Sequence, residues 1–148
     1  MDHAYYMDLA LALAREAADA GEVPVGCVIA GPDGQVIGTG RNRRRERADA
    51  TAHAEMEAIR AACEALGDWR LEGCTMYVTL EPCPMCTGAI IMSRLPVLVF
   101  GAREELTGSC GSVIDLFQER YGHKPKVYGG VRKDECAALL RSFFQSRR

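Results

Sequence analysis

The chain has 148 residues, a length that suits one hydrophobic core, so we expect a single domain over residues 1–148. Apolar residues make up 48% of the composition and charged residues 26%, which is typical of a globular protein and excludes a disordered or fibrous chain. The formal net charge of −2 argues against a surface that is basic throughout, so any nucleic-acid binding would depend on local basic patches.

Hydrophobic periodicity divides the chain into helices and strands. In chain order, the expected elements are a helix over residues 2–20, strands over 25–30 and 35–40, a helix over 52–66, a strand over 75–80, a helix over 84–93, strands over 97–100 and 126–128, and a helix over 133–146. Asp49 or Thr51 is expected to cap the second helix. Residues 102–124 show no clear pattern.

The order of these elements predicts the fold class. A Gly-Pro-Asp-Gly sequence at residues 31–34 separates the first two strands, which are therefore expected to form an antiparallel hairpin. Strands that alternate with helices after such a hairpin predict a mixed sheet of about five strands with helices packed on its faces. The expected class is α/β.

Residues 1–20 carry charged side chains between their apolar positions, which excludes a signal peptide and a membrane span. We therefore expect a cytoplasmic protein with no membrane partner. Seven cysteines in such a chain should stay reduced, so a disulfide framework is not expected. Five of them are interpreted as small buried hydrophobic residues: Cys27, Cys63, Cys74, Cys110 and Cys136.

Cys83 and Cys86 are separated by two residues and lie where a strand gives way to a helix. The partial positive charge of a helix N-terminus favours the thiolate form of both, which is the form that binds metal. Thiolate together with imidazole is a typical zinc donor set. A redox pair is the alternative, but it leaves the intervening Pro84-Met85 and the His-Ala-Glu sequence at residues 53–55 unexplained.

A structural zinc site needs four protein ligands, and the sequence has no second C-x-x-C and no H-x-x-x-H. Three ligands would leave one position open for a reacting molecule. Of the three histidines, His3 lies near the terminus and His123 in a Gly-Lys-Pro loop, whereas His53 lies at an expected helix start. His53 is therefore the expected third ligand, with a capping or surface role as the ordinary alternative.

Glu55 follows His53 by two residues, a spacing that brings both to one metal only at an irregular first turn. A carboxylate beside a metal-activated water can take its proton and return it to a leaving group. We therefore expect hydrolysis with Glu55 as proton shuttle. The ordinary alternative is an acidic residue that the helix dipole favours.

The sequences His53-Ala54-Glu55 and Pro82-Cys83-Pro84-Met85-Cys86 match the H-x-E and P-C-x-x-C signature of the zinc nucleobase deaminases. Segments along nearly the whole chain resemble the bacterial tRNA-specific adenosine deaminases: residues 22–26, Asn42, 52–59, 79–86, 100–103 and 136–140. The resemblance implies a cytidine-deaminase-like three-layer α/β/α sandwich. It also implies a homodimer with one Zn²⁺ per subunit.

The same resemblance implies hydrolytic deamination of the wobble adenosine in a tRNA anticodon stem-loop to inosine, by a zinc-activated hydroxide with a glutamate proton shuttle. The family's zinc ligands fall on His53, Cys83 and Cys86. Its proton shuttle falls on Glu55. An anticodon loop already offers unpaired bases, which lowers the cost of unstacking the target.

The resemblance also places substrate contacts. Asn42 would hydrogen-bond the flipped purine, and Pro24 and Val25 would line its pocket. Ala54 and Glu104 are further candidates for substrate contact. The chain departs from the related sequences in two places: an arginine run replaces a proline expected shortly after Asn42, and Glu104-Glu105-Leu106 stands where an aspartate and later a lysine are expected.

Residues 41–47 read Arg-Asn-Arg-Arg-Arg-Glu-Arg. The guanidinium groups of Arg43 and Arg44 could hold phosphates that flank a flipped base, while a solvated loop is the ordinary alternative. A second cluster closes the chain with two aromatic and two cationic residues, which could stack and pair with RNA: Phe143, Phe144, Arg147 and Arg148. One of the two phenylalanines is expected to belong to the core.

Two other functions stay open at this point. A deaminase of free guanine or another nucleobase would share the P-C-x-x-C sequence, but it has no use for phosphate-binding arginines. A catalytically inactive zinc and RNA-binding subunit would not need the carboxylate of Glu55 beside its metal.

Overall fold

The computed structural model describes residues 2–147, so Arg148 of the C-terminal cluster lies outside the described residues. Its centre is a five-stranded sheet in the order β2-β1-β3-β4-β5. The strands are β1 (Gly26–Ala30), β2 (Val36–Arg41), β3 (Thr75–Leu80), β4 (Val97–Ala102) and β5 (Lys126–Tyr128). β1 pairs antiparallel with β2 and β3, and β3, β4 and β5 are parallel. The expected hairpin and mixed sheet are confirmed.

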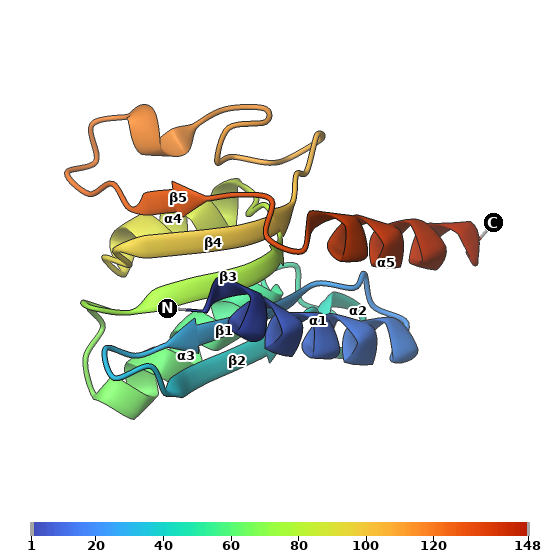
Figure 1. Ribbon diagram of the computed structural model, residues 1–148, viewed down its shortest axis with the longest axis horizontal. Helices are drawn as coiled ribbons and strands as arrows, with labels where there is room; N and C mark the ends of the chain where they lie inside the picture. Colours follow the sequence, from blue (N-terminus) through green and yellow to red (C-terminus); the bar gives the residue numbers. More distant parts are fainter. Residues whose placement is uncertain (1, 148) are drawn as a thin grey trace.

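Helices cover both faces of this sheet (Figure 1). α1 (His3–Asp19) and α5 (Lys133–Gln145) lie on one face, and α3 (Ala54–Leu66) and α4 (Pro84–Met92) lie on the other. In β1, Cys27 and Ile29 belong to the core under α3 and α4, whereas Val28 and Ala30 pack under α1. Because helices cover both faces of the sheet, successive residues of β1 enter opposite cores, and the sequence of β1 is apolar throughout. The three-layer α/β/α sandwich is confirmed.

Two glycines let α3 pack directly on β2. A Cβ atom on Gly38 would lie 2.3 Å from the carbonyl oxygen of Ala58, and one on Gly40 would lie 2.2 Å from that of Ala54. Only glycine allows two backbones to approach this closely. The first turn of α3 is thereby held against the end of β2.

The structure differs from the sequence-based expectation at the start of α3. The helix begins at Ala54 with His53 as its N-cap residue, so Asp49 and Thr51 do not cap it. Asp49 instead accepts hydrogen bonds from the N–H and hydroxyl of Thr51, which closes a separate turn. A short side chain that bonds its own neighbouring backbone is unavailable to the helix behind it.

The arginine run is also different from a loop, because Arg44–Arg47 form the one-turn helix α2. Residues 102–124, which show no clear sequence pattern, contain a short 3-10 helix, η1 (Leu116–Gln118). Within residues 2–147, each helix is too short or too polar to span a lipid bilayer.

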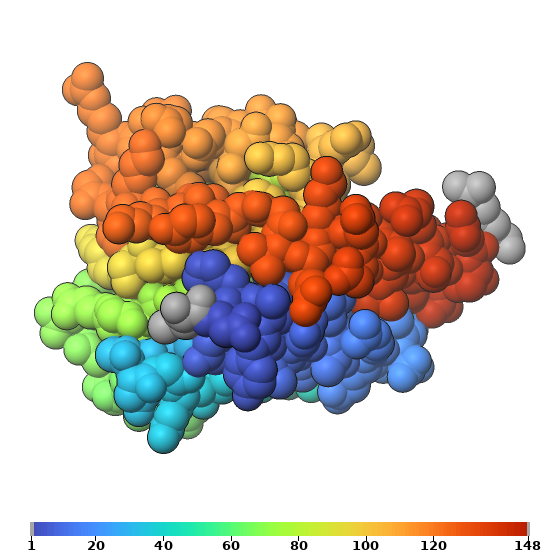
Figure 2. Space-filling view, in the orientation of Figure 1, coloured from blue at the N-terminus to red at the C-terminus, as the bar shows by residue number. Residues whose placement is uncertain are grey.

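α5 continues beyond the end of the sheet, and its last turns stand beside the end of α1 (Figures 1 and 2). Phe143 is buried there and Phe144 is 52% exposed, so Phe143 is the core residue of the pair. Four of the cysteines expected to be small core residues are buried, and Cys63 is partly exposed. The described cysteines are all free.

Candidate active site

Two helix N-termini meet at the carboxyl end of β3. His53 is the N-cap residue of α3 and Cys83 is the N-cap residue of α4, and both have extended backbone conformations. Neither side chain makes a capping hydrogen bond, so both are available to a ligand. Pro84 occupies the first turn of α4, where its missing N–H costs nothing, and Cys86 follows within that turn.

The three donor atoms have the spacing of one tetrahedral metal site. His53 Nδ1 lies 3.7 Å from Cys83 Sγ and 3.5 Å from Cys86 Sγ, and all three atoms lie within 4.8 Å of one another. Ligands bound tetrahedrally to one zinc lie roughly 3.5–3.8 Å apart, given its usual Zn–S and Zn–N distances. Among residues 2–147 no second group of His, Cys, Asp and Glu is arranged in this way. The residues present fit Zn²⁺.

The two cysteines differ in protonation. Hydrogen bonds from Cys86 and then His53 lower the pKa of Cys83 to about 4, although burial opposes the shift. The pKa of Cys86 is raised, first by the hydrogen bond with Cys83 and then by burial. Without a metal, the hydrogen bond between the two thiols thus favours one thiolate, at Cys83, and one protonated thiol, at Cys86. A bound divalent cation would deprotonate the second thiol as well.

Glu55 lies in the first turn of α3, His53 lies just before that helix, and both residues line one cavity. Glu55 is 4% exposed. Burial raises the pKa of its carboxyl group to about 7, against the smaller opposing effects of a backbone hydrogen bond and of His53. A carboxyl group with a pKa near neutrality can both accept and return a proton at physiological pH.

A small cavity of about 110 Å³ opens onto this cluster. Its lining includes His53, Glu55 and Cys83, together with residues from four other segments: Val23, Val25, Asn42, Arg44, Leu80, Glu81, Glu104 and Thr107. Val25, Asn42, Arg44 and Glu104 are thus gathered at the metal-binding cluster. Pro24 and Ala54 are buried beside it but do not line the cavity.

Asn42 is held by two hydrogen bonds. Its Nδ2 donates to the carbonyl oxygen of Val23 at 3.1 Å, and its Oδ1 accepts from the N–H of Ala54 at 3.0 Å. An amide side chain has one further N–H and one further lone pair. Asn42 therefore joins the Val23 segment to the start of α3 and retains capacity for a ligand.

The arginine run is largely neutralised within the protein. Arg41 is buried and pairs with Glu46 at 2.8 Å, and Arg43 pairs with Glu57 at 2.9 Å and with Glu46 at 3.2 Å. Arg44 is exposed, and within residues 2–147 it has no carboxylate partner. Arg43 and Arg44 therefore differ as candidates for a phosphate contact, because ion pairs with Glu46 and Glu57 already neutralise Arg43.

Glu22 fixes α2, a role that sequence reasoning missed. Its buried carboxylate accepts hydrogen bonds from the N–H groups of Arg45 at 3.1 Å and Glu46 at 2.8 Å. These are free donors at a helix N-terminus that Arg43, the local N-cap residue, does not satisfy. The only sequence signal is an acidic residue just before the apolar Val23-Pro24-Val25 segment, which does not reveal a partner some twenty residues away.

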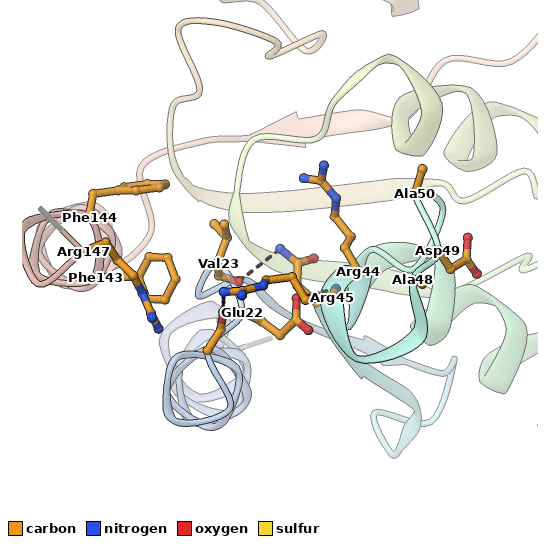
Figure 3. Close-up of a pocket in the computed structure, with 12 residues that line it drawn as sticks. Glu22, Val23, Arg44, Arg45, Ala48, Asp49, Ala50, Phe143, Phe144 and Arg147 are labelled. Carbon is orange, nitrogen blue, oxygen red and sulfur yellow. Dashed lines mark hydrogen bonds between the residues drawn. The ribbon is translucent and has the colours of Figure 1, made fainter.

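A larger groove of about 570 Å³ adjoins the small cavity and shares Val23, Asn42 and Arg44 with it. Figure 3 shows Phe144 and Arg147 of α5 on one side of this groove and Arg44 and Ala50 on the other, with Glu22 and Val23 between them. Arg45 also lines it. The groove thus presents cationic and aromatic side chains beside the metal-binding cluster.

An α/β/α sandwich with a His-Cys-Cys donor set and a buried glutamate beside it defines the class of zinc deaminases. Residues 1–102 match the family model of the cytidine and deoxycytidylate deaminase zinc-binding region. The chain belongs to this family.

Similar proteins include tRNA adenosine deaminases and a guanine deaminase. The tRNA-specific adenosine deaminase of Bacillus subtilis (strain 168) is 46% identical, over 97% of this chain and 89% of that protein. A structure from studies of A-to-I editing by tRNA:A34 deaminases at the wobble position of transfer RNA matches with a TM-score of 0.89 and 46% identity, over 92% of this chain and 99% of that one. A guanine deaminase from Nitrosomonas europaea matches with a TM-score of 0.76 and 26% identity, over 95% and 83%.

Two curated relatives are much longer than this chain. They are named tRNA(Ile)-lysidine synthase, come from Deinococcus deserti and Deinococcus radiodurans, and are 52% and 49% identical over 96% and 93% of this chain. The chain spans 27% and 24% of their lengths.

Proposed function

We propose that this chain hydrolytically deaminates the wobble adenosine of a tRNA anticodon stem-loop to inosine. The observation that carries the proposal is a buried carboxyl group beside a metal-binding cluster, in the lining of a small cavity that adjoins a cationic and aromatic groove. The cavity suits a single base, and the groove suits the chain that flanks it. The 46% identity to a protein named tRNA-specific adenosine deaminase supports the same substrate.

His53, Cys83 and Cys86 would hold one Zn²⁺ per chain. When bound, the ion would supply Lewis acidity and allow water to act as a nucleophile at neutral pH. Three protein ligands are the number that catalytic zinc sites typically have.

Glu55 would move the protons of the reaction. Its carboxylate accepts a proton from the attacking water and delivers it to the purine ring nitrogen, and a second transfer allows the exocyclic amine to leave as ammonia. Burial supports this role because it holds the pKa of Glu55 near neutrality. Without Glu55, the proton lost by the attacking water and the proton gained by the leaving amine would both have to be exchanged with solvent. The buried position of Glu55 limits that exchange.

Asn42 would recognise the flipped base through the N–H and lone pair that its two internal hydrogen bonds leave free. Val25 would contact the base from the same wall of the cavity. Pro24 and Ala54 would support these two residues from behind, since neither lines the cavity.

The groove would hold the nucleotides on either side of the base. Arg44, Arg45 and Arg147 offer guanidinium groups for phosphates, and the exposed ring of Phe144 offers a face on which a base can stack. Arg43 would contribute less, because Glu46 and Glu57 neutralise it. A local patch of this kind binds RNA although the whole chain carries a net charge of −2.

The chain would act as a single cytoplasmic domain that forms a homodimer. An apolar hollow of about 160 Å³, formed by α4 and the segment after β4, supports dimer formation. Met92 and Tyr121, which line it, are 68% and 55% exposed. Exposed apolar surface of this kind is typical of a protein interface.

A free-base deaminase is the second candidate, and the match to a guanine deaminase supports it. The two functions make different demands on the groove, because a free base would leave Arg44, Arg147 and Phe144 without a ligand. A zinc-binding subunit without activity would leave the raised pKa of the buried Glu55 without a use.

The test incubates zinc-loaded protein with an anticodon stem-loop that carries a wobble adenosine, with adenosine, cytidine and guanine in parallel. Ammonia release and base identity are measured. Inosine is expected in the stem-loop alone. Turnover of a free base at a similar rate would favour the free-base enzyme, and no turnover of any substrate would favour the inactive subunit.

A further inference from the structure

Glu81 lies between β3 and α4, two residues before Cys83, and its side chain is 0% exposed. A carboxylate in such a position is unfavourable unless hydrogen-bond donors surround it. The H-x-E and P-C-x-x-C signature of the family does not include Glu81, so the burial of this residue has another reason.

The donors to Glu81 all come from one distant segment, residues 104–112. Oε1 accepts from the N–H of Glu104 at 3.2 Å and from the hydroxyl of Ser112, and Oε2 accepts from the N–H groups of Cys110 at 3.0 Å and Ser112 at 3.1 Å. Nη1 of the exposed Arg103 lies 4.0 Å from Oε1. Three of the four hydrogen bonds thus fix backbone positions rather than side chains.

Neighbouring contacts tie the same segment to the turn that holds the cysteines. The N–H of Ser109 donates to the carbonyl oxygen of Pro82 at 2.9 Å, and the hydroxyl of Thr87 lies 3.4 Å from Cys110 Sγ. A Cβ on Gly108 would lie 2.6 Å from the carboxylate of Glu81, so glycine is required for the approach.

The segment that Glu81 holds also forms part of the substrate cavity, since Glu104 and Thr107 line it together with Glu81 itself. We infer that Glu81 is a positioning residue: its carboxylate fixes residues 104–112 against the metal-binding turn and so sets the wall that faces the substrate. The inference rests on the proposed function for the identity of the substrate, but not for the hydrogen bonds.

The experiment compares Glu81→Gln with the wild-type chain, and uses Glu119→Gln, an exposed glutamate of the following segment, as matched control. Glu81→Gln removes one charged acceptor oxygen, so KM for the stem-loop is expected to rise about tenfold or more, while zinc content and kcat stay near wild type. Amide hydrogen exchange of residues 104–112 is expected to be faster in this variant. Glu119→Gln is expected to match the wild type in each measurement.

Unchanged KM and unchanged exchange in folded, zinc-loaded Glu81→Gln would overturn the inference. A loss of kcat with KM unchanged would also overturn it, because that result means a role in catalysis or in general stability. If Glu81→Gln does not fold, Ser112→Ala replaces it, since it removes one hydrogen bond and leaves the carboxylate. A smaller rise in KM and faster exchange of the segment are then expected, and wild-type values for both would overturn the inference.

The wild-type reaction separates this inference from the proposed function. If the wild-type chain deaminates guanine or cytidine instead of the stem-loop, the proposed substrate is wrong and KM is measured for the base that reacts. If it deaminates nothing, hydrogen exchange alone decides, with the same expected and contrary results.

Discussion

The carboxyl group of Glu55 would be about half protonated at pH 7 if its pKa is about 7, whereas an exposed glutamate is almost entirely ionised. Burial makes the difference, and a nearby divalent cation would shift the group back toward the carboxylate. The residue is therefore suited to take a proton when the metal is bound and to give it up when negative charge develops on the base.

Glu55→Gln is expected to keep zinc and to lose deamination by a factor of about 10² to 10⁴, because general acid–base catalysis contributes about this much. Metal analysis and single-turnover rates measure the two quantities. Glu64→Gln, an exposed position on the same helix, serves as control and is expected to retain activity. Loss of zinc together with activity would assign Glu55 to metal binding instead of proton transfer.

Zinc binding is expected to tighten as pH rises from about 6 to 8, because metal ligands must lose their protons. The pKa of Cys83 is about 4, so this thiol is already ionised over the whole range. The pKa values of Cys86 and His53 are raised, so their protons are the ones that zinc displaces. Chelator competition at several pH values measures the affinity, and an affinity independent of pH would contradict the protonated thiol at Cys86.

At the scale of elements, α2 shows how a charged sequence becomes a structured one. Glu46 and Glu57 pair with Arg41, Arg43 and Arg47, and Glu22 satisfies the free N–H groups of the turn. The paired arginines hold α2 against α3. Arg44 remains at the junction of the small cavity and the groove.

Arg44→Ala is therefore expected to weaken stem-loop binding and to reduce the slope of log affinity against log salt by about 1, as the loss of one phosphate contact does. Arg43→Ala is the matched comparison, and a smaller change in slope is expected because its charge is already paired. Fluorescence anisotropy across a salt titration measures both. Equal slopes for Arg44→Ala and wild type would exclude a phosphate contact.

Gly40→Ala is expected to lower the free energy of unfolding by about 1–3 kcal/mol or more, because the added Cβ would meet the backbone of α3. Gly31→Ala is the control, since a Cβ there would be 3.4 Å or more from its neighbours. Urea denaturation measures both variants. Equal stabilities would show that β2 and α3 can separate without cost.

At the scale of the whole molecule, the sheet places the chemistry at one end. His53 and Cys83 belong to different crossovers, and both stand where a helix begins beside the end of the sheet. α3 lies in the connection from β2 to β3, which run parallel on either side of β1, and α4 lies in the connection from β3 to its parallel neighbour β4. Both crossovers place their helix on the same face of the sheet. A groove between α2 and α5 then leads from this end to the surface (Figure 3).

Met92→Glu is expected to convert the proposed dimer to a monomer, because it places a charge in the apolar hollow of α4. Sedimentation velocity measures the mass, and circular dichroism checks that the variant is folded. Glu119→Gln serves again as control, since its side chain is exposed and it does not line the hollow. A monomeric wild type would exclude the proposed dimer. A dimeric Met92→Glu would place the interface elsewhere.

The sequence by itself determined the order and class of the elements, because periodicity, turn residues and the apolar cores are local properties of the chain. It also singled out His53, Glu55, Cys83 and Cys86, since the helix starts and the C-x-x-C spacing are local as well. β3 and β5 have the expected bounds, and the other expected elements differ by one or two residues at one or both ends.

Only the tertiary structure decided which charges remain free and which buried carboxylates act as supports. The carboxylate of Glu22 accepts hydrogen bonds from the backbone of α2, and that of Glu81 accepts them from the backbone of residues 104–112. These partners lie far apart in sequence, so no periodic pattern predicts them. The same holds for Arg43 and Arg44, which are neighbours in sequence but differ because only Arg43 meets Glu57. Hydrogen bonds and ion pairs depend on the positions of both partners, and the fold sets those positions.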